Sequence, residues 1–208
     1  VGVVWARAAA GSASESVNEM LRADDIAQGL FDNCFQIFEG PDAPDVRITE
    51  LDRELILFLE NPTSSNNVGE TYEAERVELP PDVDRTYRFE GYQIFQVKDA
   101  TVSVSELNDI TKARLAFQVD IKNFNTDPFG RVILNSPIAQ LVNYEFDPVM
   151  KKPVPVLKVN GANKGIENSF RVTNDLFATG ADQRLVNNRP YYFIAIAYAY
   201  NNYMTFDP

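Results

Sequence analysis

The side chains that most often carry catalysis are nearly missing from this sequence of 208 residues. It contains no histidine and a single cysteine, Cys34. Without histidine, Ser/His/Asp triads, Cys/His pairs and histidine-ligated zinc sites are all excluded. Cys34 follows Leu30 and Phe31 and precedes Phe35, a setting that favours a buried, inert thiol over a nucleophile. We therefore expect no hydrolytic activity and no bound transition metal.

Carboxylates are the remaining side chains that could do chemistry. Hydrolysis by carboxylates alone needs two carboxyl groups that face each other across a cleft. Neighbouring acidic pairs such as Asp24/Asp25, Glu73/Glu75 and Asp82/Asp84 could in principle serve this purpose. No motif frames any of these pairs, so we interpret them as solvated surface charge and predict that the chain is not an enzyme.

Calcium is the one cofactor that the acidic residues leave open. Glu39, Asp42 and Asp45 surround Pro41 and Pro44, and their carboxylates could hold a Ca²⁺ ion that stiffens this segment. Their spacing does not match an EF-hand loop. We expect no other cofactor.

The net charge of the chain limits its partners. With 19 basic and 30 acidic residues, the net charge is −11, which repels nucleic-acid phosphates and anionic lipid. The sequence also has no apolar run of the roughly 18 residues that a membrane-spanning helix needs. We expect no nucleic-acid partner and no direct insertion into a membrane.

The elements that must position these residues are mostly strands. Hydrophobic residues make up 45% of the chain and aromatic residues 12%, and Ile, Val, Thr, Tyr and Phe favour strands. We therefore expect an all-β fold. The segments whose length and alternation predict strands are Val46–Ile48, Leu55–Leu59, Tyr87–Val97, Arg114–Ile121, Ile138–Phe146, Ser169–Thr173 and Tyr191–Tyr200. We expect Arg114–Ile121 to pair with Ile138–Phe146, and Gly91 to mark a bulge or a close backbone approach.

The first 40 residues form a region of their own. Val1–Ala6 is typical of a short strand, and Ser16 followed by Glu19 is a capping-box pattern that predicts one helix from Ser16 to about Phe35. The apolar positions at helical spacing are Val17, Met20, Leu21, Ala27, Leu30 and Phe31. We expect this apolar face to dock on the β domain, so the region is either a packing extension or the tail of a preceding domain.

A segment rich in proline and glycine, residues 40–45, predicts the domain boundary. Residues 1–40 hold the strand and the helix, and residues 41–208 form the β domain. Within the β domain, about 99–165 is longer than any ordinary connection and itself contains strand patterns.

Three places in the β domain resemble a fibronectin type III domain of bacterial secreted proteins. Ala43–Val46, followed by Leu55–Leu59 and Asn61-Pro62, is similar to the family's A and B strands, with Leu59 where the family usually has tryptophan. The sequence Phe-Glu-Gly-Tyr-Gln-Ile-Phe at 89–95 is similar to its C strand.

The third place is the most specific. Leu185 stands six residues before Tyr191, and Tyr191, Phe193, Ala195 and Ala197 alternate as in the family's E–F turn and F strand. The resemblance implies that Tyr191 is a buried tyrosine-corner residue, with its hydroxyl bonded to nearby backbone.

The resemblance implies a fibronectin type III/Ig-like β-sandwich with one long insertion at about 99–165 and no final G strand. The core residues that it implies are Leu59, Tyr92, Ile94, Tyr191, Phe193 and Ala195.

The Val-Val-Trp-Ala-Arg run and the helix after it resemble the end of a domain in large surface proteins of Bacteroidota, which are commonly exported by the type IX secretion system. By that analogy we expect a secreted or cell-surface protein.

The last predicted strand is apolar on both faces, whereas an ordinary sandwich strand keeps one polar face in water. We expect the helix or the 99–165 insertion to cover its second face. If neither does, Tyr192, Tyr198, Tyr200 and Tyr203 would form an interface or a platform for stacking sugar rings. That outcome would favour a carbohydrate-binding or glycosidase accessory module.

The function that we expect is structural or adhesive, in an extracellular or cell-surface protein. The partners would be other domains of the same parent chain or neighbouring subunits. A sandwich that stops one strand short has an open edge. A strand could fill it from Val1–Ala6, from a neighbouring subunit, or from the parent chain beyond residue 208.

Overall fold

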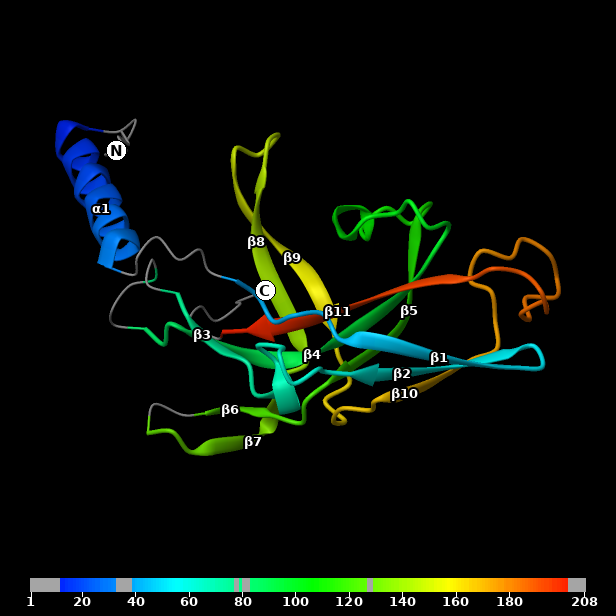
Figure 1. Cartoon of the computed structure of the whole chain (residues 1–208). Coiled ribbons are helices and arrows are strands. Elements are labelled where there is room, and N and C mark those ends of the chain that lie inside the picture. Colours follow the sequence, from blue (N-terminus) through cyan, green and yellow to red (C-terminus); the bar gives the residue numbers. More distant parts are fainter. Residues whose placement is uncertain (1–11, 33–38, 77–78, 80–82, 127–128, 202–208) are drawn as a thin grey trace. The chain divides into compact units, whose positions relative to one another are not determined.

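A computed structural model describes residues 12–32, 39–76, 79, 83–126 and 129–201 (Figure 1). The chain divides into two compact units. The first contains the described parts of Val1–Glu39, Glu73–Arg88 and Asn201–Thr205, and the second contains Gly40–Tyr72 and the described parts of Phe89–Tyr200. The division after Glu39 lies at the expected proline-rich boundary, but two later segments also belong to the first unit.

Among the described residues, α1 (Ala13–Asp32) is the one α-helix, and it begins three residues before the expected start. The Oγ atom of Ser12 accepts a hydrogen bond of 3.2 Å from the backbone N–H of Glu15. The prediction that Ser16 caps the helix was therefore wrong, because Ser12 and Glu15 form an earlier Ser-x-x-Glu pattern. The predicted end near Phe35 and the predicted strand Val1–Ala6 lie outside the described residues, as does Cys34.

Several residues of the predicted docking face of α1 are exposed in the described part of the chain. Val17, Met20 and Leu21 are about half exposed. Docking of this face on the β domain stays a prediction.

The strands form antiparallel sheets, which confirms the all-β fold with one helix. The first sheet has the order β1 (Asp45–Leu51), β2 (Glu54–Glu60), β10 (Ser169–Val172). The second has the order β11 (Tyr192–Tyr200), β4 (Thr86–Val97), β3 (Glu73–Glu75), and β5 (Ala113–Asp120) also pairs with β4 (Figure 1). Two hairpins add β6 (Phe124–Thr126) with β7 (Val132–Pro137), and β8 (Gln140–Asp147) with β9 (Lys152–Asn160). Two short 3₁₀ helices, η1 (Val68–Glu70) and η2 (Val104–Glu106), lie in loops.

The expected pairing of Arg114–Ile121 with Ile138–Phe146 is wrong. Strand β5 pairs with β4, and β8 pairs with β9 instead. Pro153 and Pro155 hide β9 in the sequence, since proline is confined to strands with a free edge. Asp147 stabilises the turn of this hairpin. Its carboxylate accepts hydrogen bonds from the backbone N–H groups of Val149 and Met150.

The core lies between the two larger sheets. Leu57, Leu59, Phe170 and Val172 of the first sheet are buried, and so are Tyr92 and Ile94 of β4. The ring of Phe117 on β5 lies 5.1 Å from the ring of Phe170 on β10, so the sheets contact each other directly. Among the expected core residues, Leu59, Tyr92, Ile94 and Ala195 are buried, whereas Tyr191 and Phe193 are only partly buried.

Gly91 lies at a close backbone approach, one of the two roles expected for it. A Cβ atom at this position would stand 2.1 Å from the carbonyl oxygen of Val119 and 2.5 Å from the hydroxyl of Tyr198. The irregularity in the β4–β5 register lies further along, between Ile94 and Phe95. A glycine is therefore needed for β5 and β11 to close on β4.

The second face of β11 is covered by the start of the inserted region. Ile194 and Ile196 pack against a buried cluster of Val97, Leu107 and Ala113. An ion pair between Glu106 and Lys112 holds the loop that carries Leu107. Of the two expected covers, the insertion therefore fills this role along the middle of β11.

Candidate functional site

Strand β11 ends its sheet. It pairs with β4 on one side, and in the part of the chain that the structure describes no strand pairs with its other side (Figure 1). The backbone N–H and C=O groups along a free strand edge can pair with another chain. Because β11 is nine residues long, it offers a longer edge than β10 or β3.

The sequence of β11, Tyr-Phe-Ile-Ala-Ile-Ala-Tyr-Ala-Tyr, contains no charged residue and no proline. Its side chains are committed to packing on both faces: Ala195 is buried, and Ile194 and Ile196 contact the inserted region. The Tyr198 hydroxyl donates a hydrogen bond of 3.2 Å to the carbonyl oxygen of Val119. The free side of β11 therefore presents backbone without a nearby side-chain charge from the strand itself.

The other edges of the two larger sheets carry charged residues. On β1, Arg47 pairs with Glu60 at 3.2 Å, and its guanidinium lies 4.8 Å from the centre of the Phe58 ring. On β10, Arg171 donates a hydrogen bond of 2.6 Å to Glu54. On β5, Arg114 lies over the ring of a loop phenylalanine. Charged side chains on an edge oppose pairing with a further strand, so β11 differs from these edges in kind.

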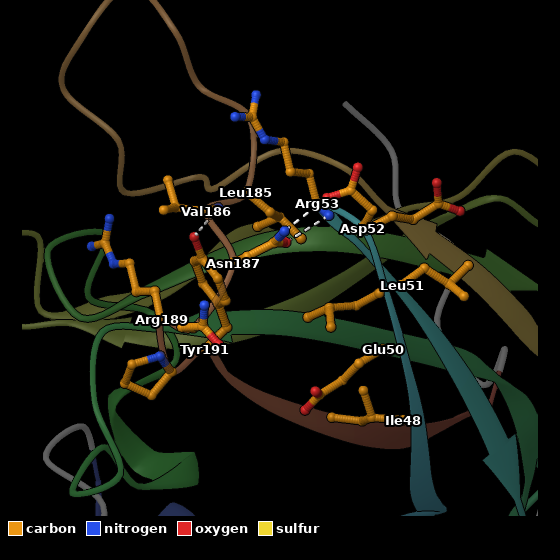
Figure 2. A pocket seen from close by; sticks show the side chains of 14 residues that line it. Ile48, Glu50, Leu51, Asp52, Arg53, Leu185, Val186, Asn187, Arg189 and Tyr191 are labelled. Atoms are coloured by element: carbon orange, nitrogen blue, oxygen red, sulfur yellow. Dashed lines mark hydrogen bonds between the residues drawn. The ribbon is translucent and has the colours of Figure 1, made fainter.

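A groove of about 570 Å³ lies before the start of β11 (Figure 2). Its walls are the turn of the β1–β2 hairpin and the segment 185–191. The Asn187 side chain joins the two walls: its Nδ2 donates to Asp52 at 2.7 Å, and its Oδ1 accepts the N–H of Arg53 at 2.8 Å. The backbone of Arg53 has a positive φ of 53°, which this hydrogen bond helps to hold.

Tyr191 stabilises the wall of the groove that is formed by residues 185–191 (Figure 2). Its hydroxyl accepts a hydrogen bond of 2.8 Å from the backbone N–H of Val186, five residues earlier, and Leu185 beside it is buried. The bond to backbone that the resemblance implied is therefore present. The tyrosine ring itself is only partly buried, because it lines the open groove.

A buried aspartate ties this wall to the centre of the sheet. Asp175 accepts hydrogen bonds from the side chain of Gln96 at 2.7 Å and from the N–H of Phe177 at 2.9 Å. Arg189, which lines the groove, lies 3.2 Å from the second oxygen of Asp175. Two charged groups of the groove, Asp52 and Arg189, thus take part in contacts that hold its walls.

The expected calcium ligands have other partners or positions. The Asp42 carboxylate accepts the N–H of Asn66 at 2.8 Å, and the Asn66 side chain accepts the N–H of Asp42 at 2.7 Å. Asp45 begins β1 and is exposed, and Glu39 belongs to the other unit. No group of three His, Cys, Asp or Glu side chains that could hold a metal ion occurs among the described residues.

Three of the acidic residues singled out in the sequence, Glu73, Glu75 and Asp84, take part in surface ion pairs. On β3, Glu73 lies 3.2 Å from Arg88, and Glu75 lies 3.8 Å from Arg85. Asp84 pairs with Arg88 as well, and the backbone N–H of Thr86 followed by Arg88 lowers the pKa of its carboxyl group. Asp82 lies outside the described residues. These contacts are those of solvated surface charge.

The tyrosines proposed for a sugar platform or an interface are separated by the structure. Tyr192 is 36% exposed, Tyr200 is partly buried, and Tyr198 is turned inward by its hydrogen bond to Val119. Tyr203 lies outside the described residues. In the described chain these residues form no continuous exposed row.

Sequence reasoning missed a buried polar cluster between β4, β5 and the segment after β9. Glu90 and Asp120 are only 4% and 2% exposed, and Asn123 donates a hydrogen bond of 2.8 Å to Glu90. The signal that could have found it is the isolated glutamate in an otherwise buried stretch of β4, since carboxylates are rarely buried without a partner.

No family model, no curated protein and no solved structure matches the chain. Within the described residues, no helix is both long and apolar enough to cross a membrane. The site must therefore be interpreted from its own geometry.

Proposed function

We propose that this chain is a non-catalytic structural or adhesive module whose β11 edge receives an additional strand. The single observation that carries this proposal is the difference between the edges: β1, β3, β5 and β10 contain charged residues, and β11 contains none. A long, uncharged, unpaired edge is normally avoided because it promotes pairing with other chains. The uncharged free edge of β11 is explained if it functions by pairing with a further strand.

The strand order supports a finer interpretation of the fold. We propose an incomplete fibronectin type III-like sandwich, in which β1, β2 and β10 are the A, B and E strands, and β4 and β11 are the C and F strands. In such a sandwich the G strand pairs with F. The free side of β11 is then the position of the G strand, and the inserted region 99–165 is an elaboration between the C and E strands.

The strand that fills this edge would come from another domain of the parent chain or from a neighbouring subunit. Strand addition gains most of its affinity from backbone hydrogen bonds and needs no charged site on the receiving strand. The groove lies beside the segment that leads into β11, and the hydrogen bonds of Asn187 and Tyr191 hold its walls. By its resemblance to bacterial surface modules, the protein would act outside the cell.

A pair of matched lysine substitutions tests the proposal. Tyr192 on β11 and Ile48 on β1 are both partly exposed residues of edge strands, at 36% and 43%. In sedimentation experiments over a range of concentrations, we expect the full chain to associate, and Tyr192→Lys to weaken association by roughly tenfold, which is about 1.4 kcal/mol. Ile48→Lys should leave it unchanged.

Two results would count against strand addition between subunits. The first is equal weakening by both lysines, because the effect would then be a general charge effect. The second is a chain that stays monomeric at every concentration while the backbone amides on the free side of β11 exchange rapidly with solvent.

A further inference from the structure

The buried polar cluster contains two oxygen atoms that lack a hydrogen-bond donor. The Asn123 Nδ2 atom donates to Glu90 Oε2 at 2.8 Å. The other oxygen of each side chain, Glu90 Oε1 and Asn123 Oδ1, is buried and has no hydrogen-bond partner. A buried acceptor without a donor destabilises the folded state, so two such oxygens in one pair of side chains require an explanation.

The charges around Glu90 do not favour its ionised form. Asp120 on β5 is buried, and its carboxylate accepts the N–H groups of Ala162 and Asn163. From β11 the neighbouring titratable group is the Tyr198 phenol, and Lys122 and Lys164 in the adjoining segments are exposed to solvent. Burial first, and the Asp120 charge in addition, raise the pKa of Glu90 to about 8, against the opposing effect of the Asn123 hydrogen bond.

We propose that Glu90 is a neutral carboxylic acid in the folded protein, and that its proton, carried on Oε1, is donated to Asn123 Oδ1. The acid and the amide then each donate one hydrogen bond and accept one, in a cyclic pair. One proton supplies the donor that both orphaned oxygens lack. It also removes a second negative charge from beside Asp120.

The pair fastens the inserted hairpins to the sheet. The backbone N–H of Asn123 donates to the side chain of Asn163 at 2.8 Å, and the N–H of Gly165 donates to the carbonyl oxygen of Asp120 at 3.0 Å. Residues 121–123 lead into β6, and residues 161–165 leave β9. The protonated Glu90–Asn123 pair, here called the latch, therefore connects β4 to both ends of the β6–β9 region.

The latch makes stability depend on pH. The pKa of Glu90 is raised in the folded protein, so the folded state holds its proton over a range where the unfolded chain has lost it. Stability should fall as pH rises from about 4.5, the ordinary value, to about 8 and then stay level with respect to this group. Above that range the ionised Glu90 would loosen the β6–β9 region.

Glu90→Gln is the most direct test, because a glutamine amide can form the same cyclic pair with Asn123 at every pH. We expect the urea midpoint of the wild type to fall relative to Glu90→Gln between about pH 5 and pH 8. Glu167→Gln, at an exposed glutamate of the same unit, should follow the wild type. The infrared band of a protonated carboxyl group should be present at pH 6.5 in the wild type and missing in Glu90→Gln.

Three results would overturn the proposal. A difference between wild type and Glu90→Gln that does not change from pH 5 to pH 8 would mean that Glu90 is ionised throughout. The absence of the carboxyl band in the wild type would mean the same, even if the variant failed to fold. A wild-type midpoint that rises with added CaCl₂, while that of Glu90→Gln does not, would place a cation rather than a proton between the two oxygens.

Discussion

The two edge strands β1 and β11 both have a free backbone edge, but they differ in charge and in exposure to solvent. β1 is exposed along nearly its whole length and carries Asp45, Arg47 and Glu50, with Arg47 held by Glu60 and Phe58. β11 packs on both faces and carries no charge. Charged, solvated side chains on an edge strand oppose pairing with a further strand. On an uncharged edge whose side chains pack on the protein, the backbone N–H and C=O groups remain available for hydrogen bonds to another strand. This difference is why we propose β11, and not β1, as the edge that receives a further strand.

The largest effect is expected from a charge placed among the packed side chains of β11. Ile196→Lys would put an ammonium group against the cluster of Val97, Leu107 and Ala113, and should cost about 3 kcal/mol of unfolding free energy. Ile48→Lys on β1 should cost less than about 0.5 kcal/mol. Urea titrations of both variants measure the contrast. Equal costs would mean that β11 is no more committed to packing than β1.

A smaller loss is expected at the turn before β11. Tyr191→Phe removes the acceptor for the N–H of Val186 without changing the ring, and should cost about 1 kcal/mol. The same titration measures it. Unchanged stability would show that the hydrogen bond does not hold the wall of the groove, and the tyrosine-corner interpretation would fail.

The smallest effect on stability sharpens the comparison from the other side. Arg47→Ala removes an ion pair between two exposed side chains, so it should change stability by at most about 1 kcal/mol. It also takes the only cation from β1. If edge charge is what prevents pairing, this variant should associate more strongly than the wild type in sedimentation. Association weaker than that of the wild type would contradict the role given to Arg47.

The source of the added strand can be tested separately by deleting Val1–Ala10. If this run is donated between subunits, the truncated chain should lose its oligomers in size-exclusion chromatography. If the oligomers persist, the strand comes from elsewhere in the neighbour.

Most strands could be predicted because their patterns are local. The uninterrupted apolar run Leu55–Leu59 and the long apolar segment Tyr191–Tyr200 can each be recognised from neighbouring residues alone, and both segments form strands in the structure. Strand β9 was missed because its two prolines outweigh its alternating valines, and a free edge that tolerates proline is not visible in one sequence. The helix start was misplaced because two Ser-x-x-Glu patterns follow each other directly in residues 12–19.

The candidate site was only half predictable. The apolar character of both faces of β11 is plain in the sequence, and so is the need for a cover. The absence of charge on β11 compared with β1 becomes meaningful only when both are known to be edges, which depends on pairing between distant segments. The Glu90–Asn123 pair joins residues 33 positions apart, and no local pattern announces it.

Hydrogen exchange of the β11 backbone amides tests the central claim most directly. At low concentration we expect alternate amides from Tyr192 to Tyr200 to exchange rapidly, because every second N–H points away from β4. At concentrations where the chain associates, these fast amides should become protected in the wild type and stay fast in Tyr192→Lys. The amides of β1 should keep the same alternation of fast and slow exchange at every concentration. Fast exchange of the same β11 amides in the associated wild type would contradict strand addition at this edge.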